Sequence, residues 1–260
     1  MKKHWWVFVF LAAVPLSQTI AQPSLPPNAI VNGASFAAAT ALNGALAPGA
    51  IVSAFGSNLA SGTQLALSVP LSTTIAGSSL AFTAGSVTYP APLFFVAASQ
   101  INAQVPFDVP VGAAVTAQIT FNGQKSAAQS VTMAAVSPGI FFHTDGSGAL
   151  LHNDTFDFVD STNPAKRGEF IDIFCTGLGA VDKTVASGTI GPNPAANTIA
   201  KPAVTVAGQA ASVVFSGLAP GFVGLYQVAF QVPNVTGGNQ DVIMSVNGLQ
   251  SNTVKMAVAP

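Results

Sequence analysis

The clearest alternation of apolar and polar side chains lies near the end of the chain, in residues 226–232. Its large apolar members are Tyr226, Val228, Phe230 and Val232, and the residues between them are small or polar. Such alternation places the large side chains on one face of a β-strand, against a core. Pro233 has no amide hydrogen to give to a ladder, so we expect the strand to end there.

A shorter version of this strand occurs earlier, in residues 99–106, where Gln100, Ile101 and Val105 match Gln227, Val228 and Val232. Other segments match in the same order, about 120 to 130 residues apart: 47–59 with 166–178, 74–77 with 204–208, Asn122-Gly123 with Asn247-Gly248, and 131–136 with 254–258. The chain therefore reads as two copies of one β-domain, in which Val105 and Val232 are equivalent.

Within the first copy, the apolar pattern predicts a series of short strands. They cover residues 51–55, 78–83, 87–89, 93–96, 100–105, 115–121 and 129–136. The Asn122-Gly123 pair favours a type I′ hairpin, because both residues tolerate a positive φ. Short strands, frequent turn signals and no long helical period predict an all-β fold of two tandem Ig-like β-sandwich domains, each large enough for its own core.

We divide the chain accordingly into four parts. Residues 1–21 are a signal peptide, 22–142 a first Ig-like domain with an N-terminal extended segment, 143–165 an acidic connector, and 166–260 a second Ig-like domain. The signal peptide is predicted from Lys2, Lys3 and His4, followed by a short apolar run and small residues up to Ala21. A membrane anchor is the alternative, but the run is shorter than the roughly 20 residues that a spanning helix needs. We expect a secreted or cell-surface protein with no transmembrane span in the mature chain.

Composition narrows the possible partners. Charged residues make up 7% of the chain, against roughly 25% in typical soluble domains. The surface must therefore be covered mainly by Ser, Thr, Asn, Gln and Gly. No basic patch is present to neutralise phosphates, so nucleic acid is not an expected partner. An extracellular protein or a polysaccharide fits this surface better.

Catalytic chemistry finds little support. The chain has one cysteine, Cys175, which lies in an apolar run and is expected to be a buried core residue rather than a nucleophile. No Gly-x-Ser-x-Gly elbow occurs, and after signal removal His143 and His152 are the histidines available to a hydrolase. We therefore expect a non-catalytic protein and keep a hydrolase as the less favoured alternative.

The expected connector is the acidic part of the chain, because residues 145–182 hold 7 of its 9 acidic residues. Asp145, Asp154 and Asp157 are weak calcium candidates, since carboxylate oxygens suit that ion, although their spacing does not match an EF-hand loop. Zinc bound by His143 and His152 is a weaker alternative. Without a metal, the segment would be a solvated linker.

Aromatic side chains could also form a carbohydrate-stacking platform. The candidates are Phe94, Phe95, Phe141, Phe142, Phe222 and Tyr226. Aromatics at strand spacing are more often core residues. Phe222 differs because it lies on a Gly/Pro-rich turn, where an exposed ring would mark a contact site.

Several motifs carry a family resemblance. Residues 48–59 (PGAIVSAFGSNL) resemble the first strand and turn of IPT/TIG-type Ig-like domains. A secreted acidobacterial family of uncharacterised function is similar over five further motifs: residues 30–36 (IVNGASF), 99–106 (SQINAQVP), 163–168 (NPAKRG), 176–181 (TGLGAV) and 217–228 (GLAPGFVGLYQV). The chain departs from the family pattern at Cys175 and at Ala229, where Asn is usual.

The resemblance implies a C-terminal region of extracellular proteins and supplies no catalytic residues. Together with the composition, it predicts a structural or adhesion module of the cell envelope or extracellular space. A carbohydrate- or calcium-binding module is the alternative.

Overall fold

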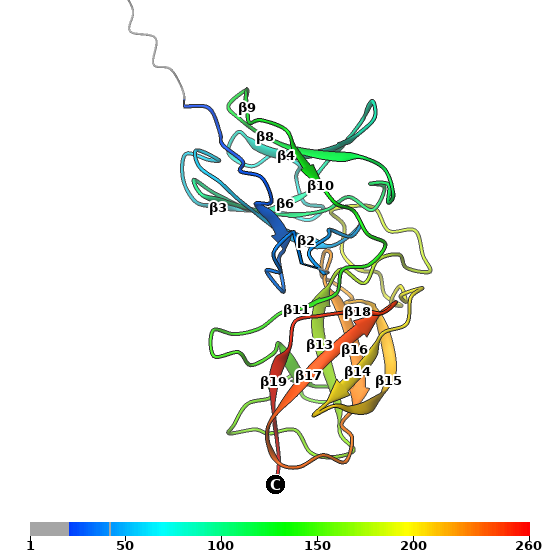
Figure 1. Ribbon diagram of the computed structural model, residues 1–260. Coiled ribbons are helices and arrows are strands. Elements are labelled where there is room, and N and C mark those ends of the chain that lie inside the picture. The colour runs from blue at the N-terminus through cyan, green and yellow to red at the C-terminus, as the bar shows by residue number, and fades with distance from the viewer. Residues whose placement is uncertain (1–20, 42) are drawn as a thin grey trace, which may run out of the picture.

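The computed structural model describes residues 21–41 and 43–260, and this part of the chain is built from strands and loops without a helix (Figure 1). No helix there could cross a membrane. The predicted signal peptide lies almost entirely outside the described residues. Two Ig-like β-sandwich domains lie end to end, the first containing β1–β10 and the second β11–β19. The predicted all-β fold is confirmed.

The first domain has two separate sheets. One has the order β1 (Ile30–Asn32), β2 (Ile51–Phe55), β7 (Gln100–Gln104), β6 (Leu93–Ala97) and β3 (Gln64–Leu65). The other has the order β10 (Gln129–Val131), β8 (Val115–Phe121), β4 (Ser78–Ala84) and β5 (Val87–Pro90), with β9 (Gln124–Lys125) also on β8. Buried side chains from both sheets, including Phe82, Ile101 and Ile119, form one core.

The second domain has one continuous sheet that folds over its own core. The strands are β11 (Gly139–Ile140), β12 (Leu150–His152), β13 (Phe170–Thr176), β14 (Ala203–Val206), β15 (Gln209–Leu218), β16 (Tyr226–Gln231), β17 (Gly238–Val246), β18 (Leu249–Gln250) and β19 (Val254–Val258). The first part of β15 pairs with β14 and the rest pairs with β16, with a bulge between Val213 and Phe215. In the first domain β5 and β6 together occupy the place of β15. The chain breaks between them after Pro90, so they belong to separate sheets.

The predicted duplication is visible in the hydrogen bonds. The amide of Gly49 donates to the carbonyl of Val105 at 2.9 Å, and the amide of Gly168 donates to the carbonyl of Val232 at the same distance. Ile51 pairs with Gln104 as Phe170 pairs with Gln231. Val105 and Val232 therefore hold equivalent positions.

Both Asn-Gly pairs form the predicted tight hairpins. Asn122 and Gly123 have φ values of 47° and 80°, and Asn247 and Gly248 have values of 50° and 81°. These positive values are those that a type I′ turn requires at both central positions. The two hairpins join β8 to β9 and β17 to β18.

One expected match between the copies is wrong. Residues 74–77 do not correspond to residues 204–208, because the strand of the first domain that occupies the place of β14 is β4. Both β4 and β14 pair with the strand that leads into the Asn-Gly hairpin, β8 and β17 respectively. The turns after β4 and β14 contain Gly85 and Gly208, both with positive φ. The chain has Ala-Gly turns at 76–77 and 207–208, and this local similarity obscured the true pairing.

The segment expected as an acidic connector, residues 143–165, instead contributes β12 to the sheet of the second domain. Leu150 pairs with Ile173 as Ile30 pairs with Ala54 in the first domain. The amide of Phe156 donates to the carbonyl of His152 at 2.8 Å, and that of Phe36 donates to Asn32 at 2.9 Å. Residues 150–156 thus repeat residues 30–36. The match is hard to see in the sequence, because the first copy has Gly-Ala-Ser where the second has the more polar Asn-Asp-Thr.

Candidate functional site at the domain junction

Gln104, at the end of β7, links the two domains through a buried side chain. Its Nε2 donates to the carbonyl of Gly49 in the same domain at 3.3 Å. Its Oε1 accepts the amide of Gly188 from the second domain at 2.7 Å. The carbonyl of Gly188 in turn accepts the amide of Leu71 at 2.8 Å. The loop around Gly188 is therefore hydrogen-bonded to the first domain from two sides.

Thr176, at the end of β13, makes a second link. Its buried Oγ1 accepts the amide of Ile51 at 2.9 Å and donates to the carbonyl of Gly224 at 3.0 Å. A buried amide without a partner costs free energy, so this hydroxyl satisfies the first amide of β2 across the junction.

Asn32 and the chain between the domains make a third link. The Nδ2 of Asn32 donates to the carbonyl of Ser137 at 2.8 Å, and the amide of Ser137 donates to the carbonyl of Gly177 at 2.7 Å. A Cβ on Gly177 would lie 1.9 Å from the carbonyl oxygen of Ser137, and one on Gly139 would lie 2.5 Å from the Oδ1 of Asn32. The backbone of Gly177 thus packs directly on that of Ser137, and the backbone of Gly139 packs on the Asn32 side chain.

Three exposed phenylalanines meet beside these links, and we call them the junction phenylalanines. The rings of Phe36 and Phe55 lie 6.4 Å apart with a 40° tilt, and those of Phe36 and Phe142 lie 6.5 Å apart, edge to face. Their exposed fractions are 48% for Phe36, 38% for Phe55 and 44% for Phe142. Phe142 belongs to the second domain, so the junction assembles the cluster. The sequence pattern placed Phe142 in a candidate platform but did not identify Phe36 and Phe55 as its partners. Alternation along β2 could have identified Phe55, because side chains three residues apart in a strand point to opposite faces and Val52 points into the core.

A second feature of the junction is an apolar groove of about 480 Å³. Phe107, Val109 and Val111 line it from the first domain, and Val181 and Val185 from the second. Phe107 also packs against the core of the second domain, and its amide donates to the Oγ of Ser187 at 2.9 Å. Phe107 therefore adds apolar contact between the domains to the hydrogen-bonded junction.

The calcium candidates do not converge. The Oδ1 of Asp145 accepts the amide of Ser147 at 2.9 Å and its hydroxyl at 2.6 Å, and these hydrogen bonds lower the pKa of the Asp145 carboxyl. Asp154 and Asp157 are exposed on the loop after β12. The described residues contain no group of three or more His, Cys, Asp or Glu side chains arranged to hold a metal ion.

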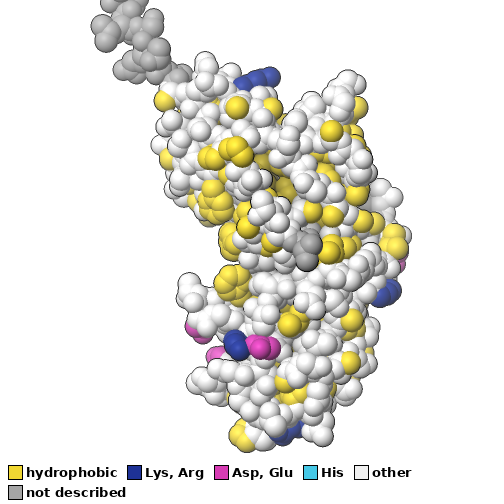
Figure 2. Space-filling view, in the orientation of Figure 1, with side chains coloured by type: hydrophobic (Ala, Val, Ile, Leu, Met, Phe, Trp, Pro, Cys, Tyr) yellow, Lys and Arg dark blue, Asp and Glu magenta, His cyan; other side chains and the backbone are white. Residues whose placement is uncertain are grey.

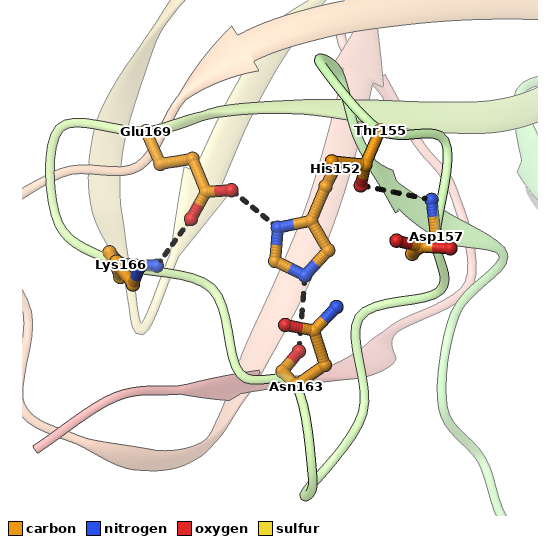
Figure 3. Close-up of polar contacts among 6 residues, drawn as sticks. All are labelled: His152, Thr155, Asp157, Asn163, Lys166 and Glu169. Atoms are coloured by element: carbon orange, nitrogen blue, oxygen red, sulfur yellow. Dashed lines mark hydrogen bonds and ion pairs between the residues drawn. The ribbon is translucent and has the colours of Figure 1, made fainter.

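Among the described residues, neither histidine ring is hydrogen-bonded to a serine, threonine or cysteine side chain. His152 is buried, with its Nδ1 against Glu169 and its Nε2 at 3.1 Å from the carbonyl of Asn163 (Figure 3). The other oxygen of Glu169 accepts the amide of Lys166 at 2.7 Å. Burial lowers the pKa of His152, but the hydrogen bonds to Glu169 and Asn163 and the charge of Glu169 outweigh it, so the pKa lies above its ordinary 6.5. The cluster ties the loop after β12 to the start of β13.

The remaining predicted residues divide between core and surface. Cys175 is fully buried, as expected, and burial raises the pKa of its thiol, which makes it a poor nucleophile. Tyr226 is buried, and its hydroxyl donates to the carbonyl of Gly179 at 2.5 Å. His143 packs edge to face on Phe158 at 5.1 Å. Phe222 lies on the predicted turn and is exposed there.

Solved structures that are similar to this chain match it at low sequence identity and low TM-score. The Bacteroides ovatus protein SGBP-B of a mixed-linkage glucan utilization locus, solved with a mixed-linkage heptasaccharide, is 15% identical with a TM-score of 0.33; the match covers 85% of this chain and 45% of that one. The Escherichia coli adhesin FdeC is 15% identical with a TM-score of 0.27, over 91% and 66%. Domains 5–6 of the S-layer protein SbsC are 13% identical with a TM-score of 0.28, over 91% and 98%.

No family model and no curated protein matches the sequence. The resemblance to an acidobacterial or IPT/TIG family therefore remains a prediction. At TM-scores below 0.5 these solved structures support no conclusion about this chain, so its function has to be argued from the junction.

Proposed function

We propose that the chain is an exported, non-catalytic structural or adhesion module of the cell envelope or extracellular space, which holds two Ig-like domains as one rigid unit. The observation that carries the proposal is the buried Gln104 side chain, which bonds both domains at once. Interfaces between domains are commonly polar and permit relative motion. Here three separate sets of hydrogen bonds oppose that motion.

The proposal includes no catalysis and no bound metal. His152 is engaged by Glu169 and Asn163, and Cys175 is enclosed in the core. The Asp145 carboxylate is occupied by Ser147. The predicted signal peptide supports export, and the scarcity of charge supports an uncharged extracellular partner.

Small-angle X-ray scattering of residues 22–260 tests the rigid unit. We expect the profile to fit one fixed arrangement of the two domains. Gln104→Ala should broaden the distribution of interdomain distances, because the amide of Gly188 loses its partner. Gln231→Ala is the matched control, since Gln231 donates to Gly168 at 2.9 Å as Gln104 donates to Gly49, but is exposed and remains within its own domain. A wild-type profile that requires many domain orientations would disprove the proposal.

A further inference from the structure

We propose that the junction phenylalanines and the neighbouring outer face of β2 and β7 form a binding site for a neutral polysaccharide. This rests on the proposed function in one respect, that the rigid junction holds Phe142 beside Phe36. The site shares Phe142 with the aromatic platform expected from the sequence but excludes Phe222, which lies on a separate turn.

The aromatic part of the site is a faceted surface of three half-exposed rings. The 40° tilt between Phe36 and Phe55 and the perpendicular contact of Phe36 with Phe142 point their faces in different directions. The faces of aromatic rings are electron-rich, and the C–H groups on one side of a sugar ring are weakly positive, so the two surfaces are complementary. Exposed apolar patches of this kind mark binding surfaces.

The polar part of the site is a chain of uncharged side chains beside Phe55. Phe55 pairs with Gln100 across the sheet, and Ser53 pairs with Asn102. The Oδ1 of Asn102 accepts the hydroxyl of Ser53 at 3.0 Å and the Nε2 of Gln100 at 2.7 Å. Ile101, next to Asn102 in β7, is fully buried, so the amide lies on the outer face.

These two hydrogen bonds fix the orientation of the Asn102 amide. With Oδ1 occupied by two donors, Nδ2 makes no hydrogen bond to any other described residue, and the Oε1 of Gln100 is likewise unused. Sugar hydroxyls both donate and accept, so they can satisfy a free amide donor and a free amide acceptor together. The site thus combines fixed amides with adjacent aromatic faces.

Charge selects a neutral ligand. Residues 22–137 contain Asp108 and Lys125 as their only charged residues. Asp108 lines the separate apolar groove, and Lys125 lies in β9. On the face shown in Figure 2 the charged side chains gather on the second domain, and the first is nearly bare of them. In the part of the site that the first domain contributes, an acidic polysaccharide would lose hydration without gaining a cation, whereas a neutral one loses no charge solvation.

Affinity gel electrophoresis tests the inference with the chain from residue 22 onward. The probes are soluble mixed-linkage β-glucan, xyloglucan and galactomannan as neutral polysaccharides, with polygalacturonate as the acidic comparison. We expect at least one neutral polymer to retard the protein. Phe55→Ala and Asn102→Ala should each weaken that binding about five- to tenfold, the loss of one aromatic or hydrogen-bonding contact.

Phe156→Ala is the control for removal of an exposed phenylalanine, because Phe156 lies on the second domain outside the site and its loss should leave binding within about twofold. Asn102→Ala introduces the residue that the second domain has at the equivalent position, Ala229, so the variant should fold.

Any of three results overturns the inference. These are no retardation by a neutral polymer, an equal loss of binding in Phe156→Ala, or a concentration-dependent dimer that Phe55→Ala abolishes, which would show that the face binds a second molecule of this protein. Scattering on the same samples separates the two proposals, since a rigid protein that fails to bind overturns the polysaccharide site alone.

Discussion

The two domains share one hydrogen-bond framework and differ in their surfaces. Residues 138–260 hold 8 of the 9 acidic and 5 of the 8 basic residues of the chain, whereas residues 22–137 hold one of each. The contrast also reaches buried equivalent positions, since Asn32 in β1 corresponds to His152 in β12. The framework depends on backbone pairing and on inward-facing side chains, so the outward-facing ones can diverge without loss of the fold.

The difference is sharpest on the outer face of the central strands. In the first domain Ser53 donates to Asn102, but the equivalent residues of the second are Asp172 and Ala229, which pair across β13 and β16. Asp172 is buried; its Oδ2 accepts the Nδ2 of Asn153 at 2.9 Å, and its Oδ1 has no partner among the described residues. The second copy therefore lacks the amide that the first copy has at this position.

The largest effect is expected from a substitution in the core of one domain, which tests whether the other domain unfolds with it. Ile101→Ala removes a fully buried side chain and should cost about 2–5 kcal/mol of unfolding free energy. Because the junction couples the domains, we expect differential scanning calorimetry to show one transition, shifted as a whole. Val228→Ala, at the equivalent position, should shift the same transition. Two transitions, of which each variant moves one, would show that the domains unfold independently.

A smaller effect should follow from breaking the link at the junction. Thr176→Val removes the acceptor of the Ile51 amide and should cost about 1–3 kcal/mol in chemical denaturation. Thr176→Ser keeps the hydroxyl and should restore most of the loss. Equal losses in both variants would mean that the methyl group, and not the hydrogen bond, is responsible.

Ala229→Asn would make the second domain resemble the first. The new amide can donate to the unpartnered Oδ1 of Asp172, so we expect a gain of about 1 kcal/mol in unfolding free energy. Ala229→Leu, of similar size but without an amide, should be destabilising. A gain in the leucine variant would attribute the effect to packing.

The smallest expected effect is a pH dependence that the first domain lacks. Because the pKa of His152 is raised in the folded state, the stabilisation is fully present below pH 6.5 and is lost as pH rises through the folded-state pKa. His152→Asn copies Asn32 and should flatten the unfolding free energy over this range, as measured by urea titrations at several pH values. A wild-type protein that becomes more stable across this range would contradict the assignment.

Sequence patterns predicted those parts of the fold that local chemistry determines. The Asn-Gly hairpins follow from tolerance of positive φ, and the equivalence of Val105 and Val232 follows from a repeated strand ending at proline. The sequence does not show that residues 150–156 are the counterpart of residues 30–36. The two segments share backbone hydrogen bonds, which do not depend on the side chains that differ between them. The isolation of Asp172 and the meeting of Phe36 with Phe142 depend on strand pairing and domain packing, which no local pattern reports.

The link through Gln104 also has a mechanical consequence. Residues 21 and 260 lie at opposite ends of the molecule, so a pull between them must pass through the junction (Figure 1). Gln104, Thr176 and Asn32 bridge it from separate strands, so opening the junction would require breaking the hydrogen bonds of all three. Tension would then reach the second domain without first straightening a hinge.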